Sequence, residues 1–191
     1  SSSGAGGLDT GSEAASTWYE IYRIRKSSDG TLNTLLHRAK DYLLDVSQTT
    51  GATSQGILND AANQRIGQGF KTVTTGLCEC VDVKLLKTGS PTGQFYFEIY
   101  ADSGGLPTGA ALATGDKYDV SLISTTAQFI RMVFRSPATL TATTQYHLVA
   151  RGSFAVDASN YFRWSCATGG SVYANGSAEF YNGSSWSVDT T

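Results

Sequence analysis

The chain has 191 residues and a formal net charge of −2, and only 16% of its residues are charged. Soluble domains typically carry about 25% charged residues, and here glycine, serine, threonine and asparagine take that place, which favours turns and solvated strand faces. The near-neutral charge without a basic patch argues against a nucleic acid partner. No run of 18 apolar residues predicts insertion into a membrane.

The first 60 residues predict a leader, a small hairpin and a connector. Residues 1–16 are small and polar, so we expect a flexible leader, and the start without methionine suggests the end of a longer protein. Residues 17–38 predict a β-hairpin that turns at Asp29-Gly30. Residues 39–46 fit a short helix or a strand, 48–56 predict a loop and 57–66 a helical turn.

From residue 61 onward the sequence predicts a sandwich of short strands. The clearest alternation covers 94–101, where Phe95, Phe97 and Ile99 would point inward. Further strands are expected at about 77–87, 117–123, 128–135, 144–151, 161–166 and 186–188, with turns at Asn175-Gly176 and Asn182-Gly183. The fold class is therefore all-β: an antiparallel β-sandwich of jelly-roll type over 61–191, preceded by a small β-hairpin unit over 17–60.

No constellation of residues predicts catalysis, a metal or a cofactor. His37 and His147 have no partner at metal-ligand spacing and are interpreted as ordinary strand residues. Gly67-Gln68-Gly69 and Gly104-Gly105 are interpreted as bends and turns, because no helix follows them to complete a phosphate site. The loop from Asp102 has hard ligands for calcium but lacks the several acids of a dedicated site. Six scattered acids are expected to be solvated: Glu20, Glu79, Asp82, Glu98, Asp102 and Glu179.

Three cysteines, Cys78, Cys80 and Cys166, do not form a disulfide framework, because their number is odd and their spacing irregular. Buried free thiols are the preferred interpretation. A link from Cys166 to one of the other two remains an alternative.

Outward-facing aromatic residues form the candidate ligand-binding set. Sugar rings stack on flat aromatic faces while polar neighbours bind their hydroxyls, whereas the alternative is that such residues cover a sheet or pack against another subunit. Trp164 shares a face with Phe162 and is assigned to the core. The candidates are Tyr96, Glu98 and Tyr100 on one strand, Tyr161 and Arg163 on another, and Tyr173, Tyr181 and Trp186 near the C-terminal turns.

Two sets of segments each resemble a known family. Gly7-Leu-Asp-Thr-Gly-Ser12 followed by Thr17-Trp-Tyr19 and Ile21-Tyr-Arg-Ile24 resembles a hairpin segment of phage tail fibres, and Arg65-Ile66-Gly67 echoes a stretch that follows it there. Gln68-Gly-Phe70, 85–93, 98–107, Leu140-Thr-Ala142, Gln145–Val149 and Tyr181–Trp186 resemble carbohydrate-binding or discoidin-like jelly rolls of phage and bacterial surface proteins.

The resemblance implies a non-enzymatic virion surface protein, extracellular in location. We expect the distal part of a tail fibre or head fibre that attaches to a host glycan receptor, acting as a homotrimer alongside other virion proteins. The alternatives are a capsid decoration or lattice subunit without a ligand, and a fragment of a carbohydrate-active enzyme with two carboxylates in one cleft.

Overall fold

The structure is a computed structural model that describes residues 19–25, 32–38, 44–47, 53–57, 64–155, 157–166 and 173–188. The chain divides into two compact units, Ser1–Leu44 and Asp45–Thr191. The expected boundary at residue 60 falls inside the second unit. Among the described residues, no helix has the length and apolar character needed to cross a membrane.

The first unit contains a two-stranded antiparallel hairpin. Strand β1 (Tyr19–Arg25) pairs with β2 (Leu32–Arg38), and Tyr19 lies opposite Arg38. Both strands were expected: aromatic and β-branched residues in β1 favour an extended chain, and β2 was expected as the return strand of the hairpin. The expected turn at Asp29-Gly30 lies outside the described residues.

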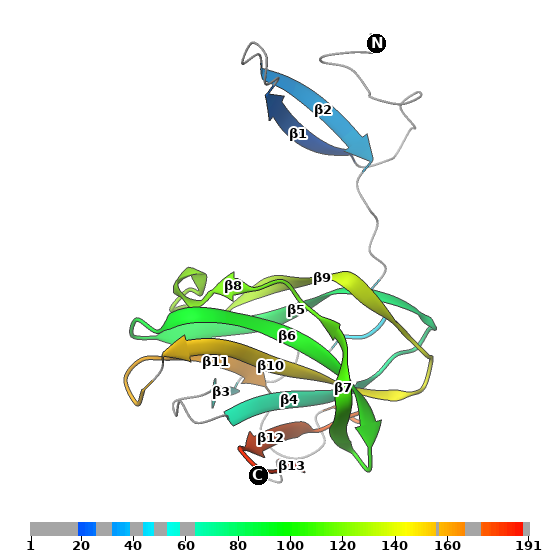
Figure 1. Cartoon of the computed structure of the whole chain (residues 1–191), viewed down its shortest axis with the longest axis vertical. Coiled ribbons are helices and arrows are strands. Elements are labelled where there is room, and N and C mark those ends of the chain that lie inside the picture. The colour runs from blue at the N-terminus through cyan, green and yellow to red at the C-terminus, as the bar shows by residue number, and fades with distance from the viewer. Residues whose placement is uncertain are drawn as a thin grey trace. The chain divides into compact units, whose positions relative to one another are not determined.

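The second unit consists of two antiparallel sheets (Figure 1). The four-stranded sheet has the order β3 (Thr53–Ile57), β11 (Tyr161–Cys166), β5 (Gly76–Thr88) and β9 (Gln128–Leu140). The seven-stranded sheet has the order β13 (Trp186–Val188), β12 (Ala178–Asn182), β4 (Gln64–Lys71), β10 (Gln145–Ala155), β6 (Thr92–Ser103) and β7 (Leu106–Thr114), with β8 (Tyr118–Asp119) also paired to β6. The predicted all-β sandwich is confirmed.

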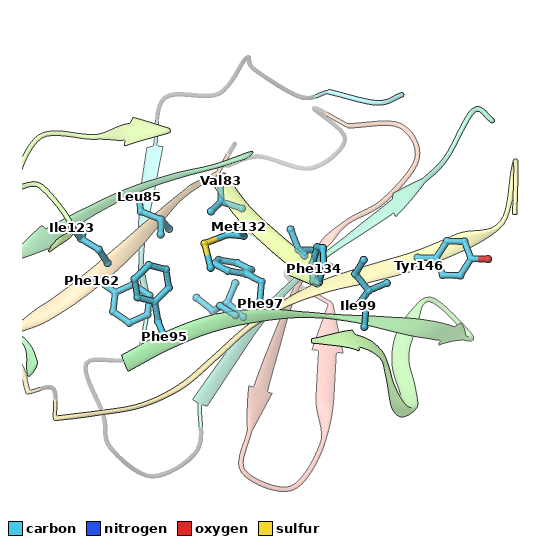
Figure 2. Close-up of a cluster of buried hydrophobic side chains, with 14 of the residues drawn as sticks. Val83, Leu85, Phe95, Phe97, Ile99, Ile123, Met132, Phe134, Tyr146 and Phe162 are labelled. Atoms are coloured by element: carbon cyan, nitrogen blue, oxygen red, sulfur yellow. The ribbon is translucent and has the colours of Figure 1, made fainter. Parts of the chain in front are cut away.

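The main core fills the space between the two sheets (Figure 2). Alternate residues of β6 point into it, and Phe95, Phe97 and Ile99 are no more than 1% exposed. Aromatic pairs connect the sheets, because Phe97 meets Trp164 edge-on at 5.0 Å and Phe95 lies 5.7 Å from Phe162. The assignment of Trp164 to the core is therefore confirmed.

The seven-stranded sheet is curled. Strands β13 and β7 stand at opposite ends of its strand order, yet they contact each other. The curl brings a second set of residues out of solvent on the side of the sheet that faces away from the main core. Val149 is 0% exposed there and does not belong to the main core cluster.

Four expectations along the chain are wrong. The predicted loop at 48–56 and helical turn at 57–66 contain the strands β3 and β4. Gly67 and Gly69 therefore lie within a strand rather than in a bend. The predicted loop after Asp102 is a tight turn at Gly104-Gly105 that leads straight into the strand β7.

Smaller differences concern a short strand and the cysteines. The strand expected at 117–123 is the two-residue β8 followed by a 3-10 helix (Val120–Leu122). Neither Cys78 nor Cys80 forms a disulfide in the described part of the structure, and burial raises the pKa of Cys78 to about 11. The side chain of Cys166 lies outside the described part of the structure.

Candidate functional site

Strand alternation gives the seven-stranded sheet a second, polar face. On β6 and β10 the core takes Phe97, Ile99, Tyr146 and Leu148, so the residues between them point to the opposite side. We call this opposite side the polar face. It carries the following charged, aromatic or histidine residues: Tyr96, Glu98, Tyr100 and Asp102 from β6, His147 and Arg151 from β10, Arg65 from β4, Glu179 and Tyr181 from β12, and Trp186 from β13.

One line of residues crosses the polar face from β13, at one edge of the sheet, to β6. Trp186 pairs with Tyr181, and Tyr181 pairs with Arg65. Val149 pairs with Gly67 in antiparallel strands. Arg151, two residues after Val149, therefore lies at the same level as Arg65, two residues before Gly67. Arg151 in turn pairs with Tyr96. These five residues, Trp186, Tyr181, Arg65, Arg151 and Tyr96, form the aromatic–arginine row.

Contacts within the row place cations over aromatic rings. The Tyr181 and Trp186 rings have centroids 5.3 Å apart, and the Arg65 guanidinium carbon lies 4.9 Å from the Tyr181 centroid. At the other end, Lys117 Nζ lies 5.8 Å from the Tyr96 centroid. These distances are typical of cation–π contacts, in which the cation is attracted by the ring quadrupole.

Beside the row, Glu98 anchors a network of charged and phenolic groups. Arg151 Nη1 donates to Glu98 Oε2 at 3.0 Å and to the Tyr100 hydroxyl at 2.9 Å, and that hydroxyl donates to Glu98 Oε2 at 2.7 Å. Burial, followed by the hydrogen bond to Glu98, raises the pKa of Tyr100 to about 12. Tyr100 is therefore a neutral donor throughout the physiological range.

A second group, which we call the histidine cluster, comprises Asp102, His147 and Glu179. His147 Nε2 lies 2.9 Å from Asp102 Oδ1, and its Nδ1 lies 3.2 Å from Glu179 Oε1. The side chains of His147 and Glu179 are each 1% exposed, whereas that of Asp102 is 25% exposed. The cluster is thus a buried imidazole held between two carboxylates on three different strands.

Glycines in β4 make room for the histidine cluster. A Cβ atom on Gly67 would lie 2.6 Å from Glu179 Oε2, and one on Gly69 would lie 3.0 Å from Glu179 Oε1. Neither distance is compatible with an unshifted carboxylate. The Gly-Gln-Gly segment therefore serves to admit a buried glutamate, which explains why glycines occupy the middle of a strand.

Seven of the eight candidates from the sequence fall on two sides of the sandwich. Tyr96, Glu98, Tyr100, Tyr181 and Trp186 share the polar face. Tyr161 and Arg163 lie on β11 in the other sheet, where the Arg163 guanidinium stacks 5.0 Å from the Tyr161 ring and donates to its hydroxyl. Since Phe162 between them points into the main core, both face away from it.

Tyr173, the remaining candidate, stands before the turn at Asn175-Gly176. Its hydroxyl is buried, and among the described residues it has no hydrogen-bond partner. The ring is only partly exposed. Tyr173 therefore does not extend the aromatic–arginine row.

Sequence reasoning missed several residues of the polar face, namely Arg65, Arg151 and the histidine cluster. The interpretation of His147 as an ordinary strand residue is wrong, because the side chain is buried between two carboxylates. The expectation of solvated acids is also wrong for Glu98 and Glu179, which are 8% and 1% exposed. The usable signal was the pair of glycines in an otherwise strand-like stretch, since such glycines mark a close approach.

The polar face has no metal-ion geometry in the described part of the chain: no group of three or more His, Cys, Asp and Glu side chains is placed to hold an ion. The two carboxylates of the histidine cluster contact opposite nitrogens of one imidazole. They therefore do not converge on a common point.

Comparisons with known proteins give no relative for this chain. No family model, no curated protein and no solved structure matches it.

Proposed function

We propose that the second unit is a glycan-binding module, and that the chain acts in host attachment as the distal part of a phage tail fibre or head fibre. The observation that supports binding is the aromatic–arginine row. Flat rings of Trp186, Tyr181 and Tyr96 offer stacking faces for sugar rings, and the guanidinium groups between them offer rigid forks of N–H donors for hydroxyls.

Arg65 supports this proposal most directly. Its guanidinium lies over the Tyr181 ring, and in the described part of the structure no carboxylate forms an ion pair with it. Arg151, by contrast, is already hydrogen-bonded to Glu98 and Tyr100. Arg65 therefore supplies ligand-directed donors, while Arg151 organises the polar groups beside it.

The attachment role is supported by the resemblance of residues 7–24 to tail-fibre segments. A single shallow row gives weak affinity for a sugar. A homotrimer on the virion would present three rows together, and avidity gains of about 100-fold or more are typical when linked sites engage at once.

Contacts on the polar face argue against the carbohydrate-active enzyme. Glu98 accepts from Arg151 and Tyr100, and both Asp102 and Glu179 contact His147. A glycosidase needs two carboxylates that flank the scissile bond of the sugar. Carboxylates engaged in this way are poorly placed for that task.

A ligand-free lattice subunit is the second candidate, because tyrosine and arginine are also enriched where proteins meet. In that case the aromatic–arginine row would be buried between subunits. Chemical cross-linking of the assembled particle would then find Lys117, beside Tyr96, joined to a neighbouring chain.

The direct experiment is binding to a glycan array by the protein and by two variants. We expect Trp186→Ala to weaken binding about tenfold or more, which corresponds to about 1.4 kcal/mol. Tyr161→Ala is the matched control, because it removes an aromatic ring from the other sheet, and it should bind as the parent does. Equal binding to every glycan, or equal losses in both variants, would contradict the proposal.

A further inference from the structure

The histidine cluster joins three strands that are distant in sequence. His147 on β10 lies 32 residues from Glu179 on β12 and 45 residues from Asp102 on β6. The aromatic–arginine row does not use these groups. The burial of the histidine cluster therefore needs its own explanation, because a buried charge is costly in free energy unless it is paired.

Only a doubly protonated imidazole satisfies both carboxylates when both are ionised. A neutral histidine has one N–H, so it could donate to Glu179 or to Asp102 but not to both. Glu179 depends on this proton most strongly, because its other oxygen, Oε2, is buried and has no hydrogen-bond partner among the described residues. Loss of the proton would leave a buried carboxylate without a counter-ion.

Other groups around the cluster do not replace the imidazolium. Strand β4 presents Gly67 and Gly69 to Glu179, and Val188 of β13 is its register partner. Strand β7 contains no ionisable residue. On the neighbouring strands Tyr100 and Arg151 bind Glu98, and Arg65 stacks on Tyr181. Lys71 also lies on β4, but in the described part of the structure the ion pairs of Asp102 and Glu179 are with His147.

We propose that protonated His147 is a latch that holds the C-terminal hairpin, β12 and β13, in place beside β4 at the edge of the seven-stranded sheet and releases it as the pH rises. The geometry supports this role because Glu179 is the only charged residue of the hairpin strands. It is also the hairpin residue whose side chain contacts His147, so this contact adds a charged interaction to the backbone pairing of β12 with β4.

The pKa shifts of His147 and Glu179 agree in direction with release of the hairpin as the pH rises. Burial opposes the charged imidazole, but the hydrogen bonds that it donates to Glu179 and Asp102 outweigh this effect and raise the pKa of His147 above its usual range. Burial also raises the pKa of Glu179. Both shifts mean that the folded state holds more protons than the unfolded state. The stabilisation from His147 is therefore complete below about pH 6.5, the ordinary histidine value, and is lost as the pH rises through the folded-state pKa.

The latch also regulates the proposed binding face, and this part rests on the proposed function. Tyr181 and Trp186 belong to the hairpin, and they contribute two rings of the aromatic–arginine row. Release of the hairpin would separate them from Arg65. Glycan binding should therefore weaken at alkaline pH.

The test is amide hydrogen exchange of the whole protein between pH 6 and pH 9, corrected for the intrinsic effect of pH. We expect protection of the amides in 178–188 to fall by up to about tenfold per pH unit across the titration, as for release of one proton. Amides of β5 and β9 should change less. In His147→Gln the protection of the hairpin should not vary with pH in this window, and Asp82→Asn, which removes an exposed partner of Arg131, should behave as the parent does.

An NMR titration keeps the proposal falsifiable if His147→Gln does not fold. The chain has only two histidines, so the His147 signals can be followed in the parent protein. Unchanged hairpin protection while His147 loses its proton would overturn the latch. Absence of glycan binding at every pH, with the exchange result intact, would instead overturn the proposed function alone.

Discussion

The absence of a side chain at Gly67 leaves the space that the Glu179 carboxylate of the histidine cluster occupies. Besides its approach to Glu179 Oε2, a Cβ there would lie 3.4 Å from the Trp186 ring and 3.6 Å from Val149. The Glu179 carboxylate is fixed by His147, and the Trp186 ring lies against Tyr181. Neither neighbour can move without disturbing another contact.

We expect Gly67→Ala to lower the free energy of unfolding by about 1–3 kcal/mol, because overpacking a filled site forces neighbouring side chains from their preferred positions. Urea denaturation of the purified protein measures this change. Gly76→Ala is the matched control, since it also lies in a strand and no atom stands within 4 Å of its added Cβ. It should change stability by less than about 0.5 kcal/mol. Equal losses in both variants would show that strand glycines matter for a reason other than packing.

For single residues, the sequence predicted which side of a strand a side chain faces better than it predicted which residues that side chain contacts. The outward direction of Tyr96, Glu98 and Tyr100 followed from period-2 alternation. The partners of His147 did not, because they are 32 and 45 residues away and depend on which strands become neighbours. Strand order is set by long-range pairing, which local spacing does not encode.

Strands were predictable where their two faces differ clearly in polarity. In β6 and β11 apolar residues alternate with polar ones, and the predicted ranges agree with the observed ones. The sequences of β3, β4 and β7 each contain glycine, and they lack this contrast. Their extended conformation comes from pairing with neighbours, which supplies hydrogen bonds that local propensity does not.

Sheet-to-sheet packing centres on Phe97 of β6, whose side chain is 0% exposed and meets Trp164 of β11 edge-on. We expect Phe97→Ala to lower the free energy of unfolding by about 3–5 kcal/mol, because it removes buried apolar surface and leaves a cavity. Chemical denaturation, with near-ultraviolet circular dichroism of the tryptophans, follows the loss.

Phe129→Ala provides the control at the same scale. Phe129 lies on β9 and is 57% exposed, and its ring is approached by Lys84 Nζ at 5.9 Å. Exposed substitutions of this kind usually change stability by less than about 0.5 kcal/mol. A loss as large as that of Phe97→Ala would mean that Phe129 is buried in an assembly of several chains, which would favour the lattice-subunit alternative.

At the scale of the whole molecule, curling of the seven-stranded sheet buries Glu98, His147 and Glu179 on the polar face, whereas the aromatic–arginine row stays partly exposed. Contact between β13 and β7 closes over residues that a flat sheet would leave in water. Alternation alone therefore predicts Glu98 and Glu179 as solvated, since it says which side a residue faces but not what covers that side. Once the curl encloses them, each acid needs a charged or polar partner.

The second unit begins at Asp45, and this residue is hydrogen-bonded to other residues of the same unit. Its carboxylate accepts from the backbone N–H groups of Val73 at 2.8 Å and Thr74 at 2.9 Å, and also from the Thr74 hydroxyl. The hydrogen bond from the Thr74 side chain is the main cause that lowers the pKa of Asp45. Asp45 is thereby connected to the second unit, where β3 also pairs with β11.

Truncation tests this division. A chain of residues 45–191 should unfold at the same urea concentration as the second unit of the full protein, because it retains Asp45 and β3. A chain of residues 61–191 should be less stable: loss of the hydrogen bonds to Asp45 costs about 1 kcal/mol, and loss of β3 leaves β11 with an unpaired edge that invites association. Sedimentation velocity should therefore detect aggregates only in the shorter chain. Identical behaviour of the two chains would place the boundary near residue 60 and show that β3 adds nothing to the sandwich.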